Sequence, residues 1–169
     1  VMKKSVLLLF FAGCVATGIF GIGRKIPMNR VNDLGQREGY WRDSVGGGFV
    51  YDLYYKGGKK DGLYKRFYRN KLFLFGEYTA DNISGTWYMF GDEGELRCTI
   101  DSIELNKDSI YTGYPCCRIF RKYKCYCADY YPSGAVKSEG YMVCDEEFEI
   151  EIWEIGEWKY YDESGNLIK

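Results

Sequence analysis

Six of the seven cysteines lie in one stretch of the chain, and thiols are the side chains here with the widest range of chemistry. Thiols pair as disulfides, bind soft metal ions or act as nucleophiles. In an exported domain, six cysteines permit three disulfides in many connectivities, and the sequence does not choose among them. In a reducing compartment they would instead be free, buried thiols. The candidate disulfide cysteines are Cys98, Cys116, Cys117, Cys125, Cys127 and Cys144.

Metal binding and catalysis are both disfavoured by what surrounds these cysteines. The pattern Cys116-Cys117 followed by Cys125-x-Cys127 lacks the C-x-x-C spacing of zinc and iron–sulfur sites, and the chain has no histidine. Histidine is also the commonest proton-transfer group near neutral pH, and no G-x-S-x-G or phosphate-loop motif is present. We therefore predict a protein that is not an enzyme and that has no metal or other cofactor.

Carboxylates leave one catalytic alternative, a hydrolase that uses paired acids. The candidates fall in predicted hairpin turns, where acids are expected for turn chemistry alone. They are Asp92, Glu93, Asp162 and Glu163. The formal charge is only -1, so no global field would recruit nucleic acid, and none is predicted as a partner.

The N-terminus, residues 1–25, has the composition of a targeting or anchoring segment. Lys3 and Lys4 precede an apolar stretch from Val6 to Ile22, which we predict as a signal or anchor helix. Phe11-Ala12-Gly13-Cys14 resembles a bacterial lipoprotein signal, with Cys14 as the lipidation site. The alternatives are an uncleaved single-pass anchor, ordinary secretion or a buried helix. The lipoprotein and the single-pass anchor both predict a membrane-associated protein of the cell envelope.

A repeat organises the rest of the chain. Gly39-Tyr40-Trp41, Gly62-Leu63-Tyr64 and Gly85-Thr86-Trp87 recur at steps of 23 residues, and Gly156-Glu157-Trp158 repeats the pattern near the C-terminus. A second glycine follows nine residues later in two copies, at Gly94 and Gly165. Alternating aromatics predict strands with one packed face, and glycine supplies the positive φ of tight hairpin turns. Each unit is therefore predicted to be a β-hairpin that needs its neighbours for stability.

The repeat unit resembles the MORN-repeat variant of bacterial proteins, including the YwqK-type antitoxins of toxin–antitoxin systems, whose unit resembles G-x-W-x-x-Y-Y-x-x-G-x-L. Gly156 to Leu167 fits almost position for position, and Gly85 to Leu96 nearly as well. The match covers Gly39 to Lys169 with one interruption, whereas the first and fourth copies are degenerate. The resemblance implies a mainly β fold, an elongated antiparallel β-meander of MORN-like hairpins over residues 30–169, with a binding role.

Two segments depart from the repeat. An insert at about residues 97–124 is predicted to hold two strands, Thr99 to Leu105 and Ser109 to Tyr114, around a polar turn. The last hairpin is lengthened by an acidic stretch from Asp145 to Glu154 in which acids alternate with apolar residues. This stretch is predicted to be a strand with a solvated carboxylate face; a calcium site or a surface for a basic partner are the alternatives.

Basic residues are concentrated between Lys56 and Lys71, where they are interleaved with aromatics. They are either the solvated face of strands or a surface for an anionic partner. The candidate binding surface consists of Tyr64, Lys65, Arg66, Tyr68, Trp87, Tyr88, Trp158 and Tyr160. The sequence thus predicts a membrane-tethered protein-binding or scaffolding module whose protein partner and oligomeric state are unknown. The alternatives are an antitoxin-like partner of a toxin protein and, less favoured, the carboxylate-dependent hydrolase.

Overall fold

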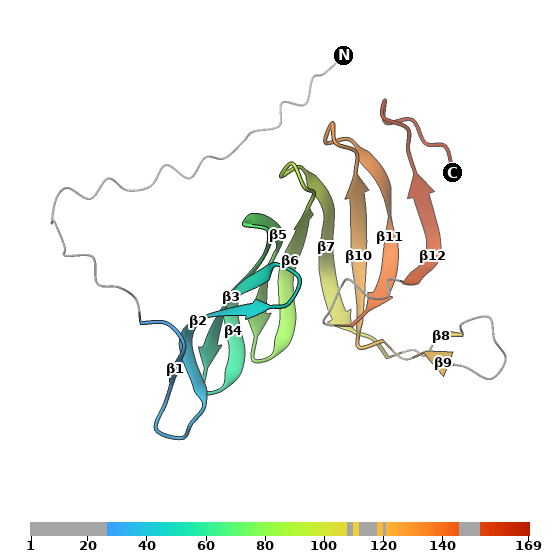
Figure 1. Ribbon diagram of the computed structural model, residues 1–169. Coiled ribbons are helices and arrows are strands. Elements are labelled where there is room, and N and C mark those ends of the chain that lie inside the picture. Colours follow the sequence, from blue (N-terminus) through green and yellow to red (C-terminus); the bar gives the residue numbers. More distant parts are fainter. Residues whose placement is uncertain (1–26, 108–109, 112–117, 120, 146–152) are drawn as a thin grey trace, which may run out of the picture.

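A computed structural model describes residues 27–107, 110–111, 118–119, 121–145 and 153–169. They form a ten-stranded antiparallel sheet in which the strands follow one another in chain order, interrupted only by a small separate ribbon (Figure 1). This confirms the predicted mainly β meander. The predicted N-terminal helix, Cys14, Cys116 and Cys117 lie outside the described residues. Within the described ranges there is no helix of the length and apolarity that a membrane crossing needs.

The main sheet has the order β1-β2-β3-β4-β5-β6-β7-β10-β11-β12. Its strands are β1 (Arg30–Val31), β2 (Arg37–Val45), β3 (Phe49–Lys56), β4 (Lys59–Tyr68), β5 (Lys71–Thr79), β6 (Asn82–Phe90), β7 (Leu96–Leu105), β10 (Tyr123–Tyr130), β11 (Val136–Cys144) and β12 (Trp153–Tyr160). The face that carries the buried side chains, including Leu53, Trp87 and Ile100, is called the inner face below. The opposite face is called the outer face.

One five-residue turn occurs four times in the sheet. In each copy the first residue's N–H donates to the carbonyl of the fifth, and the N–H of a glycine at the fourth position donates back to the first. The copies are Asn32–Gln36, Gly91–Glu95, Tyr131–Ala135 and Asp162–Asn166. The first and last copies fold β1 onto β2 and the C-terminal residues onto β12, so they cover the two edges of the sheet.

The glycines of the G-x-W motif are not turn residues, which corrects the expectation from the sequence. Gly85 and Gly156 do have positive φ values, 65° and 70°, but they lie inside strands at bulges. Between β5 and β6, Gly85-Thr86-Trp87 faces the single residue Gly76, because Phe75 pairs with Tyr88 and Glu77 with Ser84. The bulge needs a left-handed backbone, and it turns the following tryptophan over the preceding strand.

Tryptophan packed on glycine is the unit of the core. The ring of Trp87 lies so close to Gly76 that a Cβ there would be 2.1 Å from it, and the ring of Trp158 would be 2.6 Å from a Cβ on Gly140. Both indoles donate to backbone carbonyls, Trp87 to Ser84 and Trp158 to Tyr141. The small residue on one strand therefore makes room for the large one on the next, which is how a single sheet buries a core on one face.

The predicted insert is smaller than expected, and its strand pairing was wrong. Thr99 to Leu105 belongs to β7, which lies in the main sheet beside β6 and pairs with β10 rather than with residues 109–114. The excursion between β7 and β10 holds a separate ribbon of β8 (Ile110–Tyr111) and β9 (Arg118–Ile119). The register of β7 with β6 continues the repeat, and neither glycine nor tryptophan marks this in the sequence.

Candidate binding surface

The predicted binding residues do not form one surface. Tyr64, Arg66 and Tyr68 lie on the inner face, whereas Lys65 and Tyr88 lie on the outer face, where both flank Phe75 in the sheet register. Trp158 and Tyr160 share the inner face, but they lie on the last strand of the sheet. Trp87 is fully buried and packs against Tyr64 and Tyr78, so it serves the core. Strand alternation, which the sequence shows, separates these residues.

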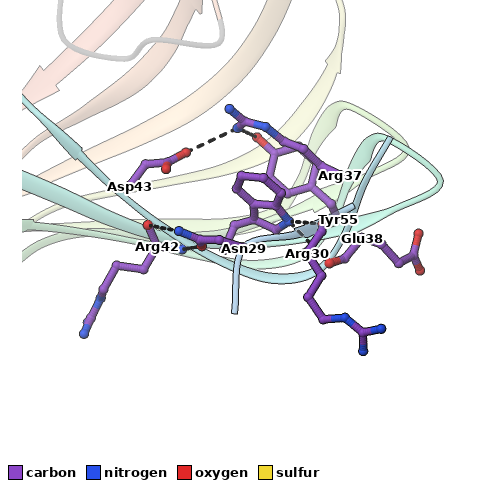
Figure 2. Close-up of polar contacts among 8 residues, drawn as sticks. Asn29, Arg30, Arg37, Glu38, Arg42, Asp43 and Tyr55 are labelled. Atoms are coloured by element: carbon purple, nitrogen blue, oxygen red, sulfur yellow. Dashed lines mark hydrogen bonds and ion pairs between the residues drawn. The ribbon is translucent and has the colours of Figure 1, made fainter. Parts of the chain in front are cut away.

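A group of cations stacked on aromatic rings occupies the inner face over β2 to β5. Arg37 is its first member: the guanidinium carbon lies 4.5 Å from the centre of the Trp41 ring and 5.2 Å from that of Tyr55. The guanidinium also donates to the Tyr55 hydroxyl at 2.9 Å and forms an ion pair with Asp43 at 3.3 Å (Figure 2). The Trp41 indole N–H donates to the carbonyls of Arg30 and Glu38.

The next strands repeat this arrangement. The Lys60 ammonium lies 4.7 Å from the centre of the Tyr78 ring, and the Arg66 guanidinium lies 4.3 Å from the centre of the Phe49 ring. The exposed Arg69 guanidinium lies 5.0 Å from the ring of Tyr68. Together with Arg37 these cations form the basic aromatic face, which consists of Arg37, Lys60, Arg66 and Arg69 with the rings beneath them. Cation–π stacking holds each positive charge at a defined place on the sheet.

The outer face of the same strands carries a closed ion pair instead. Arg42 donates to both carboxylate oxygens of the buried Asp52, at 2.6 and 3.0 Å, and it extends away from the Arg37 side of the ribbon (Figure 2). Burial and the neighbouring Asp52 carboxylate raise the pKa of Tyr40 to about 12. The Arg42 charge is therefore neutralised within the fold by Asp52.

The other end of the outer face is a tyrosine cluster around one acid. The rings of Tyr126 and Tyr141 meet edge to face with their centres 5.2 Å apart. The Glu139 carboxylate accepts a hydrogen bond from the Tyr161 hydroxyl at 2.7 Å and pairs with Lys159 at 3.8 Å. Partial burial and hydrogen bonding to Glu139 raise the pKa of Tyr126 to about 12. These groups satisfy one another and stabilise the pairing of β10, β11 and β12.

The acids that a hydrolase would need are used in turns, as the sequence predicts. The Asp162 carboxylate accepts from the backbone N–H groups of Ser164 and Asn166 and from the Asn166 side chain. Hydrogen bonds from Asn166 lower the pKa of Asp162, since they stabilise its charged form. Asp92 and Glu93 lie in the equivalent turn at Gly91–Glu95. All four acids thus lie in copies of the repeated turn, and the Asp162 carboxylate bonds within its own copy.

The four described cysteines gather on the inner face of three neighbouring strands. Cys98 of β7 and Cys127 of β10 have their sulfur atoms 3.1 Å apart, and Cys125 of β10 and Cys144 of β11 have theirs 3.5 Å apart. All four are buried free thiols in the structure. The Asp129 carboxylate lies within 4.8 Å of the sulfurs of Cys98 and Cys127 and accepts a hydrogen bond from Ser138 at 3.1 Å.

Comparison with known proteins does not assign the chain to a family. No known protein family matches the chain, and no curated protein matches it. The function is therefore inferred from the surface itself. Of the basic aromatic face, Arg66 and Tyr68 are among the binding residues predicted from the sequence, and Lys60 and Arg69 belong to the predicted basic stretch. Arg37 precedes that stretch, and only the pairing of β2 with β3 brings it to Tyr55.

Proposed function

We propose that the protein is a binding module that holds an acidic segment of a partner protein on the basic aromatic face, and that residues 1–25 tether it to the membrane of the cell envelope. The observation that carries the proposal is the row of four cations, each over an aromatic ring, on one face of β2 to β5. The stretch from Lys56 to Lys71 adds further basic residues against a single acid, Asp61.

The geometry suits recognition of carboxylates. A guanidinium held over a ring has a defined position before binding, and the planar guanidinium group matches the geometry of a carboxylate. Arg69 is exposed beside the half-buried ring of Tyr68, and Phe49 continues the aromatic surface 4.7 Å away. Aromatic and arginine side chains are the residues that most often dominate protein interfaces. An acidic segment with an apolar residue would therefore engage both the charges and the rings.

A charge-matched titration tests this function. A soluble polyglutamate peptide is titrated into the protein at low salt and followed by calorimetry, with polylysine as the control of opposite charge. We expect polyglutamate to bind and its affinity to fall as salt is added. The double variant Arg37→Gln/Arg69→Gln should weaken binding about 5- to 30-fold, since each exposed cation contributes up to about 1 kcal/mol.

The matched control removes the same charge elsewhere. Lys137→Gln/Lys159→Gln lies at the far end of the sheet, where both lysines are exposed, and should change the affinity less than twofold. An equal loss in the two double variants would show that only net charge matters and would reject the basic aromatic face. Failure of the unaltered protein to bind polyglutamate would reject the acidic partner itself.

Tethering is tested separately by the mass of Cys14 in protein taken from membranes: a lipid adduct supports a lipoprotein anchor.

A further inference from the structure

The cysteines stand where the repeat lacks its tryptophan. On the inner face one row of residues crosses the sheet in register, and its C-terminal part runs Gly76, Trp87, Ile100, Cys127, Gly140 and Trp158. Gly85-Thr86-Trp87 begins nine residues before the turn glycine Gly94, and Gly156-Glu157-Trp158 begins nine residues before Gly165. Nine residues before the turn glycine Gly134, β10 has Cys125-Tyr126-Cys127 instead. In β10, therefore, Cys125 stands at the glycine position of the motif and Cys127 at its tryptophan position.

This substitution weakens the non-covalent link between strands at the middle of the sheet. Trp87 covers Gly76 and Trp158 covers Gly140, but Cys127 faces Ile100 and has no ring to lay across β7. A buried tryptophan contributes far more to the stability of a core than a thiol does, because it removes a much larger apolar surface from water. The sheet nevertheless continues through β7, β10 and β11, the strands that carry the two sulfur pairs.

We propose that Cys98–Cys127 and Cys125–Cys144 are two disulfides that link β7 to β10 and β10 to β11 in the mature protein. Each pair is offset by two residues from direct register: Cys127 lies opposite Ile100, and Cys125 lies opposite Met142. With the sulfur atoms at 3.1 and 3.5 Å, closing each bond requires a movement of about 1–1.5 Å toward the usual S–S length of roughly 2.05 Å. Rotation of short side chains can supply most of that.

Two disulfides fit this site better than a metal ion does. A metal held by Cys98, Cys127 and Asp129 would account for one sulfur pair, whereas disulfides account for both. Two thiolates and a carboxylate would also leave a divalent ion with a net negative charge inside the core, and a disulfide is neutral. Hydrogen bonding to the partner thiol and burial raise the pKa values of Cys98 and Cys125, so the reduced pairs favour the protonated form.

Formation of the bonds needs an external oxidant. For each pair, two S–H bonds break and one S–S bond forms, while two protons and two electrons pass to a disulfide of a thiol–disulfide oxidoreductase, which becomes a dithiol. Because the finished sheet buries all four sulfurs, the exchange occurs before these strands close. Once formed, the bonds are shielded from small reductants.

Peptide mapping of the full chain tests the pairing. The protein is alkylated as its cells are opened, so that no thiol is oxidised afterwards, and is digested with trypsin without reduction. Cleavage after Arg97, Lys107, Lys124, Lys137 and Lys159 gives peptides 98–107, 125–137 and 138–159, which hold one, two and one of these cysteines. We expect a single linked species of all three peptides, lighter than their sum by four hydrogen atoms.

Fragmentation of the linked species between Cys125 and Cys127 then assigns the partners. The proposal requires peptide 98–107 to remain on Cys127 and peptide 138–159 on Cys125; the reverse assignment overturns it. Alkylated, unlinked peptides at all four positions also overturn it. A zinc ion retained in the native mass with all four thiols reduced would assign the site to a metal instead. As a control, Cys127→Ser should release peptide 98–107 completely and leave peptide 138–159 linked.

Discussion

Replacing Gly76 by alanine adds one methyl group at the tightest contact in the core. That Cβ would lie 2.1, 2.4 and 2.5 Å from three atoms of the Trp87 ring, whereas carbon atoms normally approach to about 3.5–4.0 Å. The ring must therefore retreat by about 1 Å or more, and Trp87 is 0% exposed, so its neighbours must move as well. Overpacking of this kind costs about 1–3 kcal/mol. Gly76 has no positive φ, so the effect of the alanine is steric.

A double-mutant cycle measures the steric part. We expect Gly76→Ala to lower the free energy of unfolding by about 2–3 kcal/mol in the native background. In a Trp87→Leu background the obstacle is gone, and the same change should cost under about 1 kcal/mol or be slightly stabilising, because alanine restricts the unfolded chain. The expected coupling is therefore about 2 kcal/mol. Urea unfolding followed by far-ultraviolet circular dichroism gives all four stabilities.

Gly94→Ala is the matched control for this cycle. A Cβ at Gly94 would meet nothing within 4 Å, but the residue has a φ of +85°, so alanine there costs about 1–2 kcal/mol of backbone strain. That cost should be the same with and without Trp87. If Gly76→Ala also costs the same in both backgrounds, or costs nothing, the packing of tryptophan on glycine is not the unit that stabilises this sheet.

Three further predictions concern the polar groups. Arg42→Ala leaves the buried Asp52 carboxylate without its guanidinium partner and should lower the free energy of unfolding by about 1–2 kcal/mol, a value discounted because the Arg42 side chain is 51% exposed. In urea unfolding, the double variant Arg42→Ala/Asp52→Ala should lose less than the sum of the two single variants. The pKa of Tyr40 is raised from 10.0 to about 12, so the stabilisation linked to its protonated form is complete below pH 10 and is lost as the pH rises to 12. Between these pH values the urea midpoint of Tyr40→Phe should fall less than that of the parent protein. Although partial burial opposes the effect, hydrogen bonds from the Lys122 backbone and the Arg121 guanidinium lower the pKa of Asp145. Asp145 therefore stabilises the fold above the ordinary carboxyl pKa, and this stabilisation is lost as the pH falls. Asp145→Asn should be less stable than the parent protein in urea unfolding at pH 7 but not at pH 2. An Asp145→Asn protein as stable as the parent at pH 7 would show that the Arg121 contact at 2.6 Å contributes nothing.

Much of the sheet follows from local sequence. Alternating aromatics and the turn glycines specify strands and their order, because consecutive hairpins pair with their nearest neighbours in the chain. The turn acids were predicted for the same reason: Asp162 uses its own neighbours as donors. The G-x-W glycines were assigned to turns, since positive φ is common to turns and bulges and the sequence does not distinguish them.

The candidate binding residues are spread over both faces of the sheet because adjacent residues of a strand point to opposite faces. Tyr64, Lys65 and Arg66 are neighbours in sequence, yet Lys65 lies across the sheet from the other two. Trp87 was a candidate anchor by residue type, but its place over Gly76 makes it part of the core. Burial of this kind depends on the strand beside it and leaves no local signal.

By itself the sequence determined a mainly β chain of hairpins, because the period of two and the placing of glycine act within a few residues. Tertiary structure decided which cation meets which ring, that Thr99 to Leu105 continues the main sheet, and that Cys98 faces Cys127 while Cys125 faces Cys144. These partners are separated by up to 29 residues in sequence. Register between strands brings them together, and register is set by the bulges and buried rings of the whole inner face.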